Sequence, residues 1–239
     1  MRIKWLGHSC VLITTENNKK ILIDPFKSTA TMKMWPMRMK YEPVNEEADI
    51  LLITHNHPDH NNIEAAKNPK VIIREAGQKN IDGMEIIGVE TKHANFRTKN
   101  IVFFIKAEEI TVCHVGDLGH LLDKKFIEDV IAKVDILFVP LSGFPGPSLE
   151  TAMMIINQIQ PKVVVPIHYR TPQCDAAIFK KPDKVYEMLR KNVSDLVFLK
   201  ENTHTYTKKE LEKQTETIAH IFPPYFTENN KTKKEGEIA

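Results

Sequence analysis

The stretch LLITHNHPDHNN, Leu51–Asn62, places three imidazoles and a carboxylate directly after a run of apolar residues. Its polar members are His55, His57, Asp59 and His60. Buried polar or charged side chains are costly unless they are paired, and imidazole and carboxylate are good ligands for zinc and similar cations. Four such groups within six residues can supply two pairs that face two different ions. The stretch therefore predicts a metal site at the end of a buried strand rather than a solvated polar turn.

Other short runs rich in Val and Ile also end in a polar residue. KILID ends at Asp24, ITVCH at His114 and VVVPIH at His168. Runs of this length and composition predict buried strands. Between them, Ser148 and Asp183 are predicted to cap the helices LETAMMIINQIQ and KVYEMLRKN. Interleaved strands and helices indicate an α/β or α+β class.

The totals are those of an ordinary globular protein. The chain has 239 residues, of which 42% are hydrophobic and 27% charged, and a net charge of +2. This balance gives no strong signal for nucleic acid. Three distant cysteines do not form a disulfide framework. We expect no signal peptide, no membrane span and a cytoplasmic location. We predict one domain over residues 1–222, followed by a polar tail over residues 223–239.

A resemblance to a known family appears at these motifs. THNHPDH matches the HxHxDH motif of the metallo-β-lactamase superfamily, and ILIDPF, HVGD and PIHYRT follow the family's further motifs in order. The segments IKWLGHSCVLI, HVGDLG and VDILFVPLSG resemble the branch of L-ascorbate-6-phosphate lactonase-like proteins and metal-dependent hydrolases. The match covers about residues 1–170, except that the Met-rich segment 27–47 does not map cleanly and is a candidate for substrate specificity. The fold that this resemblance implies is a four-layer αβ/βα sandwich.

The resemblance also implies a ligand set for two divalent cations. His55 and His57 would hold the first, Asp59 and His60 the second, Asp117 would bridge them, and His168 would complete the second site. We favour His93 as the third ligand of the first cation, and His114 is the rival.

Three further residues have implied roles. Asp24 would support the metal loop. His8, in GHS, is either packed at a strand turn or faces the substrate or a metal-bound water. Asp59 or Asp117 would move the proton. We therefore assign catalytic roles to Asp59 and Asp117, and also to His8 because it could face the substrate or a metal-bound water.

The implied activity is hydrolysis of an ester, lactone or similar small molecule, by a hydroxide that two metal ions activate. Zinc is the default ion for such a His-rich site, and manganese or iron would also fit. The alternatives are a phosphodiesterase or nuclease of the same fold, a metal-binding protein without hydrolase activity, and redox chemistry. The balanced charge argues against a nuclease, the intact ligand set against a binding protein, and His57, where the iron-binding branch has Glu, against redox chemistry. The sequence leaves the oligomeric state open.

Overall fold

Two β-sheets dominate the computed structural model of the chain, which describes residues 1–28, 31–32, 35–36, 39–95, 97–123, 134–143 and 146–223. The six-stranded sheet has, in spatial order, β17 (Thr203–Thr205), β1 (Arg2–Gly7), β2 (Cys10–Thr14), β3 (Lys20–Ile23), β7 (Ile50–Leu52) and β9 (Val71–Ile73). The eight-stranded sheet has β10 (Gly77–Ile81), β11 (Met84–Lys92), β12 (Lys99–Ala107), β13 (Ile110–His114), β14 (Ile136–Pro140), β15 (Val163–Ile167), β18 (Ile218–Ile221) and β16 (Asp195–Phe198). Short pairs are formed by β4 (Thr31–Met32) with β5 (Trp35–Pro36), and by β6 (Glu46–Glu47) with β8 (Ala66–Lys67).

Alternation along the strands explains why the sheets are covered on both faces. In β12, Ile101, Phe103 and Ile105 belong to the core between the two sheets, whereas Val102 and Phe104 belong to the core under the helices. Successive strand residues point to opposite faces, so a continuous apolar run indicates burial on both. The strands β2, β3 and β7 alternate in the same way between the central core and a third apolar cluster on the outer face of the six-stranded sheet.

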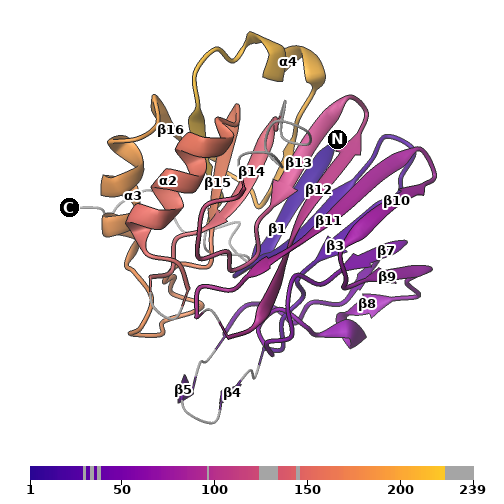
Figure 1. Cartoon of the computed structure of the whole chain (residues 1–239), viewed down its shortest axis with the longest axis horizontal. Coiled ribbons are helices and arrows are strands. Elements are labelled where there is room, and N and C mark those ends of the chain that lie inside the picture. Colours follow the sequence, from indigo (N-terminus) through magenta and orange to yellow (C-terminus); the bar gives the residue numbers. More distant parts are fainter. Residues whose placement is uncertain are drawn as a thin grey trace, which may run out of the picture.

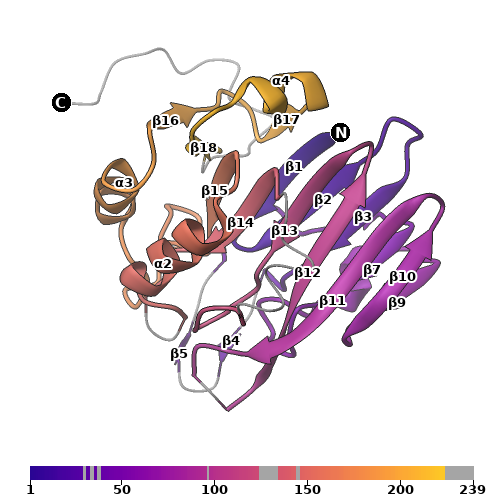
Figure 2. The ribbon, with the colours of Figure 1, turned by 45° about the horizontal axis from the view of Figure 1, so that its top comes forward.

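The helices cover mainly one side of the sandwich. The helix α2 (Leu149–Ile159) packs on β14, α3 (Pro182–Arg190) packs on α2 and β16, and α4 (Lys208–Lys213) lies near β17 and β18 (Figures 1 and 2). In the part of the chain that the structure describes, irregular segments and the 3₁₀ helix η1 (Ile63–Ala65) cover the outer face of the six-stranded sheet. The predicted sandwich of mixed sheets is confirmed.

The two helix starts test the capping predictions. The Ser148 side chain accepts a hydrogen bond from Thr151 N at 3.1 Å, which confirms it as the N-cap of α2. The prediction for Asp183 was wrong, because α3 begins one residue earlier, at Pro182, after the N-cap Lys181. Proline at the first helical position fixes φ in advance, and Asp183 then lies in the first turn, where its charge suits the helix dipole.

Parallel pairing brings the polar strand ends to one edge. β3 and β7 are parallel neighbours in one sheet, and β13, β14 and β15 are parallel neighbours in the other. The carboxyl ends of parallel neighbours lie at the same edge of a sheet. Two backbone hydrogen bonds then join the sheets there, from Ile101 N to Thr54 O at 2.8 Å and from His168 N to His8 O at 3.2 Å. Parts of the Met-rich segment 27–47, and the tail after residue 223, lie outside the described residues.

Candidate metal centre

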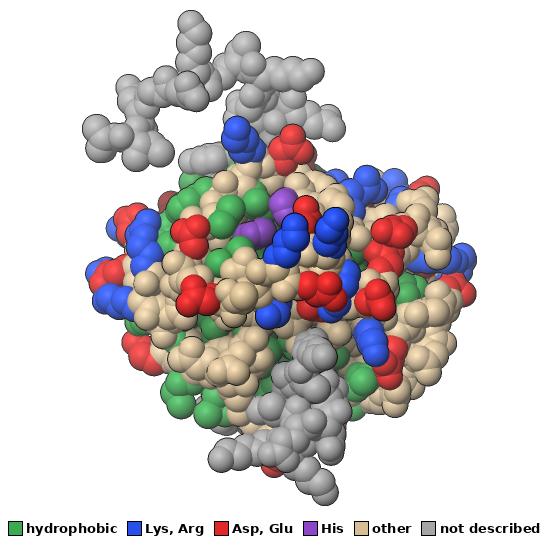
Figure 3. All heavy atoms as spheres, turned by 90° about the horizontal axis from the view of Figure 1, so that it is seen from above, with side chains coloured by type: hydrophobic (Ala, Val, Ile, Leu, Met, Phe, Trp, Pro, Cys, Tyr) green, Lys and Arg blue, Asp and Glu red, His purple; other side chains and the backbone are tan. Residues whose placement is uncertain are grey.

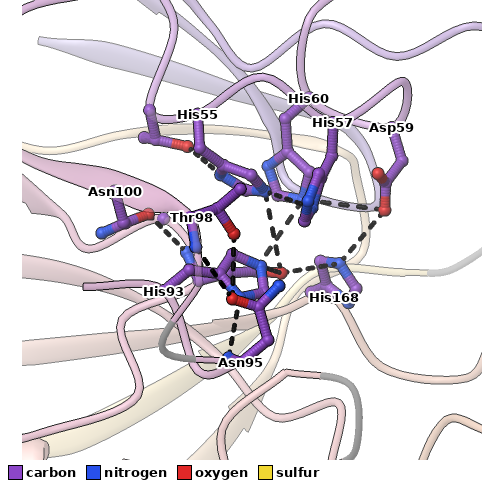
Figure 4. A network of polar contacts seen from close by, with 12 residues as sticks. His55, His57, Asp59, His60, His93, Asn95, Thr98, Asn100 and His168 are labelled. Atoms are coloured by element: carbon purple, nitrogen blue, oxygen red, sulfur yellow. Dashed lines mark hydrogen bonds and ion pairs between the residues drawn. The ribbon is translucent and has the colours of Figure 1, made fainter.

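Three histidines from two chain segments form a first cluster of metal-ligand side chains. His55 and His57 come from the turn after β7, and His93 follows β11. Their ligand atoms lie within 4.8 Å of one another, and His55 Nε2 is 3.0 Å from His57 Nδ1. The three rings point toward a common centre (Figure 4). Three imidazoles at this spacing form a set that can bind a divalent cation.

The second cluster consists of one carboxylate and three imidazoles. Its members are His8, Asp59, His60 and His168, all buried, and their ligand atoms also lie within 4.8 Å of one another. Asp59 Oδ2 is at the middle of this group: it is 3.1 Å from His8 Nε2, 3.5 Å from His168 Nε2 and 3.7 Å from His60 Nε2. The cluster joins residues that lie up to 160 positions apart in the sequence, from His8 to His168.

Asp117 lies between the two clusters. Its Oδ2 atom is 3.2 Å from His93 Nε2 and 4.0 Å from His55 Nε2 in the first cluster. The same oxygen is 3.6 Å from His168 Nε2, and Oδ1 is 3.8 Å from His60 Nε2, in the second. The seven residues predicted as ligands are therefore brought together, with Asp117 in the position of a bridge. Their ligation of metal stays a prediction.

Asp24 supports one histidine in each cluster through its carboxylate. His60 Nδ1 donates to Asp24 Oδ2 at 2.8 Å, which leaves His60 Nε2 facing the cluster. The Thr54 hydroxyl donates to the same oxygen at 2.5 Å and can accept from His55 Nδ1, 3.0 Å away. The hydrogen bond at one ring nitrogen sets which nitrogen is free for a metal, so Asp24 and Thr54 present the Nε2 lone pairs of both rings.

Asn100 fixes the position of the Asp117 loop. Its Oδ1 atom accepts from Asp117 N at 3.0 Å, and its amide group donates to Val115 O at 2.9 Å. Sequence reasoning missed both Asn100 and Thr54. Thr54 is adjacent to His55 and could have been found from that position, whereas nothing in the strand KNIVFFIKA distinguishes Asn100 as a support.

His114 lies outside both clusters although it ends β13 only three residues before Asp117. Its Nε2 donates to Ser9 O at 3.0 Å, and its Nδ1 accepts from Gly116 N at 3.2 Å. Both ring nitrogens are thus occupied by the backbone. Of the two rivals for the first cluster, the structure places His93 there and not His114.

Burial keeps several imidazoles neutral. Desolvation lowers the pKa of His55 well below its usual value, and the neighbouring His60 adds to the shift. Desolvation likewise lowers the pKa of His8 to about 4, with His168 as the next cause. A neutral imidazole has a lone pair available for a metal, whereas a protonated one does not.

The carboxylates, in contrast, stay charged. Burial alone would raise the pKa of Asp117, but His168 and His60 hold it well below its usual range. The pKa of Asp59 is also held well below its usual range, because His60 and other imidazoles outweigh its burial. Burial opposes a charge on His60 as well, yet the surrounding carboxylates, that of Asp117 first, raise its pKa to about 10. Buried carboxylates are stabilised by a nearby positive charge, which a bound cation can supply.

Unpartnered atoms test whether the site fits a metal. Buried side-chain atoms without a hydrogen-bond partner are concentrated in the two clusters, where they include His60 Nε2, His93 Nε2, His168 Nε2, Asp59 Oδ1 and Asp117 Oδ1. In native proteins nearly all buried polar atoms have a partner, so a group of unpartnered atoms in one place indicates a site that binds an ion or another ligand. All are nitrogen or carboxylate oxygen atoms, the donors that zinc and related ions prefer. The residues present therefore fit a metal centre.

Comparison with known proteins agrees with this geometry. The sequence profile of the beta-lactamase superfamily domain matches residues 2–168. The chain belongs to this family. The family assignment confirms the predicted superfamily, and the matched region contains all seven residues predicted as ligands.

Proteins similar to this chain carry hydrolase names. A UPF0173 metal-dependent hydrolase of Thermococcus kodakarensis is 27% identical in an alignment 199 residues long, and the alignment covers 72% of this chain and 85% of that protein. Another, of Saccharolobus solfataricus, is 27% identical in an alignment 229 residues long, which covers 84% of this chain and 92% of that protein. The crystal structure of a putative Zn-dependent hydrolase from Thermotoga maritima is 26% identical, with a TM-score of 0.70, and covers 93% of this chain and 99% of that one.

This member of the superfamily is thus an enzyme of the metal-dependent hydrolase class, as predicted. Among the described residues, we find no helix with the length and apolar character that crossing a membrane requires. The cytoplasmic location stays a prediction.

Proposed function

We propose that the enzyme hydrolyses an ester, lactone or similar small-molecule substrate with two divalent cations, zinc by default, held by His55, His57, Asp59, His60, His93, Asp117 and His168. The single observation that carries the proposal is the position of Asp117, whose two carboxylate oxygens lie within 4.0 Å of imidazole nitrogens in both clusters. A carboxylate between two imidazole-rich clusters is suited to neutralising two neighbouring cations.

When bound, the two cations would supply Lewis acidity and lower the pKa of water toward ~7. The residues of the chain hold and orient this site. Asp24 and Thr54 keep His55 and His60 in the tautomers that expose Nε2. Asn100 holds the backbone of Asp117. Such positioning removes reorganisation from the reaction step.

A proton must also move during hydrolysis, and we assign this step to Asp59. Its Oδ2 atom is surrounded by imidazoles, whereas its Oδ1 atom is buried without a partner. A carboxylate with one engaged and one free oxygen can stay attached to the site while the free oxygen accepts and returns a proton. No serine or cysteine nucleophile is needed for this route.

The charge distribution favours a small substrate over a nucleic acid. Net charge is +2, and basic and acidic side chains are interspersed on the face shown in Figure 3. A nuclease normally needs a basic surface that follows the phosphate backbone. A phosphodiesterase or nuclease is nevertheless the alternative that the assay must separate.

The test combines metal analysis with a substrate panel. Protein stripped by a chelator is reconstituted with zinc, manganese or iron, its metal content is measured, and turnover is recorded on a p-nitrophenyl ester, an aliphatic lactone and bis-p-nitrophenyl phosphate. We expect about two ions per chain and metal-dependent turnover of the ester or lactone. Protein that takes up no metal would overturn the proposal, and turnover of the phosphodiester alone would replace it with the alternative.

A further inference from the structure

His8 is a member of the second cluster that the HxHxDH, HVGD and PIHYRT motifs do not contain. Its Nε2 atom is 3.1 Å from Asp59 Oδ2, and its ring lies against that of His168 with 3.8 Å between centroids. The sequence left two interpretations open: a histidine packed at a strand turn, or one that faces the substrate or a metal-bound water. The side chain is fully buried, as are those of His60, His93 and His168.

The backbone of His8 is held from several directions. Its carbonyl oxygen accepts from Trp5 Nε1 at 3.0 Å and from His168 N at 3.2 Å, and its backbone also hydrogen-bonds the Tyr41 hydroxyl. His8 has a φ of 52°, an uncommon conformation for a residue other than glycine. Strained residues persist only where their surroundings over-determine them, and they cluster at functional sites.

The residue before His8 allows this arrangement. A Cβ atom on Gly7 would lie 2.5 Å from the Tyr41 ring, so only glycine permits Tyr41 to pack against the turn. The Tyr41 hydroxyl in turn lies 2.6 Å from Thr171 Oγ1, in the loop after His168. Tyr41 therefore ties the turn that carries His8 to the loop that carries His168.

The His8 ring has aromatic neighbours and one polar neighbour, the Asp59 carboxylate. The rings of Phe26 and Phe179 lie near it, with centroids 6.4 and 5.8 Å away. Nδ1 is buried without a partner, whereas Nε2 faces the cluster. His114, by contrast, has backbone partners at both ring nitrogens and does not face a cluster.

We propose that His8 is an additional protein ligand of the cation held by Asp59, His60 and His168. The inference rests on the proposed function and deepens it. With the bridging Asp117, the second site then has five protein ligands and the first site has four. The additional donor is expected to hold the ion of the second site more tightly. Metal uptake by the chain is therefore expected to be unequal, with the site of His8 filled first.

Two substitutions at His8 separate ligation from a simple hydrogen bond. His8→Ala removes both, while His8→Gln can still donate a hydrogen bond to Asp59 Oδ2 but is a poor zinc ligand. Zinc affinities are measured by competition with a chromophoric chelator, and melting of the metal-free proteins checks folding. We expect the zinc affinity of the tighter binding step to fall by ~100-fold or more in both variants. Loss of a residue that only hydrogen-bonds a ligand lowers metal affinity by at most about this factor. His220→Gln, a buried histidine outside both clusters, should leave both steps unchanged.

Nitrogen-15 spectra of the parent protein give a second measurement that needs no variant. The His8 ring is assigned through couplings to its own backbone, before and after zinc is added. Ligation through Nε2 predicts the Nδ1–H tautomer with a metal-shifted Nε2, whereas a hydrogen bond to Asp59 predicts Nε2–H. An Nε2–H tautomer in the zinc-loaded protein, or parental affinity in His8→Gln, would overturn the inference about His8 alone. A parent protein that binds no zinc would instead overturn the proposed function.

Discussion

Asp24→Asn tests how the two clusters are prepared for metal, because this substitution keeps the shape of the side chain, removes its charge and changes one acceptor into a donor. Asp24 is fully buried and accepts three hydrogen bonds, from Thr54 N at 2.8 Å, Thr54 Oγ1 at 2.5 Å and His60 Nδ1 at 2.8 Å. The amide oxygen can keep the bond to Thr54 N. The amide nitrogen then faces the two remaining donors.

The protein can respond in two ways, one that costs stability and one that blocks the metal-facing nitrogens. If His60 and Thr54 keep their present donors, two buried donor–donor contacts cost ~1–3 kcal/mol each. If they reverse, His60 becomes the Nε2–H tautomer, and the Thr54 hydroxyl must donate to His55 Nδ1, so that His55 becomes Nε2–H as well. The nitrogen that faces the metal is then blocked in one histidine of each cluster. Loss of an outer partner typically lowers metal affinity by ~10–100-fold, or about 1.4–2.7 kcal/mol for each site.

The assay is a zinc titration of the metal-free variant against a chromophoric chelator, with guanidinium unfolding of the same sample. We expect both binding steps to weaken by ~10–100-fold. Asp135→Asn is the matched control: Asp135 is 5% exposed, accepts from Thr111 N at 2.8 Å and lies before β14, at the opposite end of that strand from the metal edge. The control should lose stability and keep both affinities. Parental zinc affinity at both sites in Asp24→Asn would refute the reasoning.

The remaining predictions concern the bridge, the choice of ligand and the response to pH. Asp117→Ala should lose both bound ions and turnover, because two cations would repel across the gap, and retained occupancy in metal analysis would show that Asp117 is not the bridge. His93→Ala should reduce the metal content by one ion, whereas His114→Ala should lower the melting temperature and keep two, and the reverse pattern would exchange their roles. Burial lowers the pKa of His220 from 6.5 to about 4, and the neighbouring His204 adds to this shift. As the pH falls, His220 is therefore protonated in the unfolded chain before it is protonated in the folded protein. The contribution of His220 to the free energy of unfolding should therefore be complete above about pH 6.5 and be lost as the pH drops toward 4. His220→Gln should flatten that slope in denaturant titrations at a series of pH values, and an unchanged slope would contradict this assignment.

Local sequence was sufficient where neighbouring residues carry the information. His55, His57, Asp59 and His60 crowd one turn, so their chemistry could be inferred before any fold was known. The apolar runs of β3, β13 and β15 predicted buried strands, and Ser148 predicted the start of α2. These features depend on side-chain alternation and on hydrogen bonds between residues three positions apart, which the sequence displays directly.

Only the tertiary structure decided between His93 and His114. His93 follows one strand of the eight-stranded sheet, His114 ends another, and both precede Asp117. Their positions in the sequence therefore do not show which of them is the ligand. The pairing of β11, β12 and β13 turns His93 toward Asp117 and turns His114 toward Ser9 O. The roles of Asn100 and Thr54, and the burial of His8 against Asp59, are likewise set by contacts across 17, 30 and 51 positions. The sequence determines which groups can bind a metal, because that is a property of each side chain. Which of them share one ion is determined by strand pairing and sheet packing, because metal coordination requires atoms within a few ångströms whatever their separation along the chain.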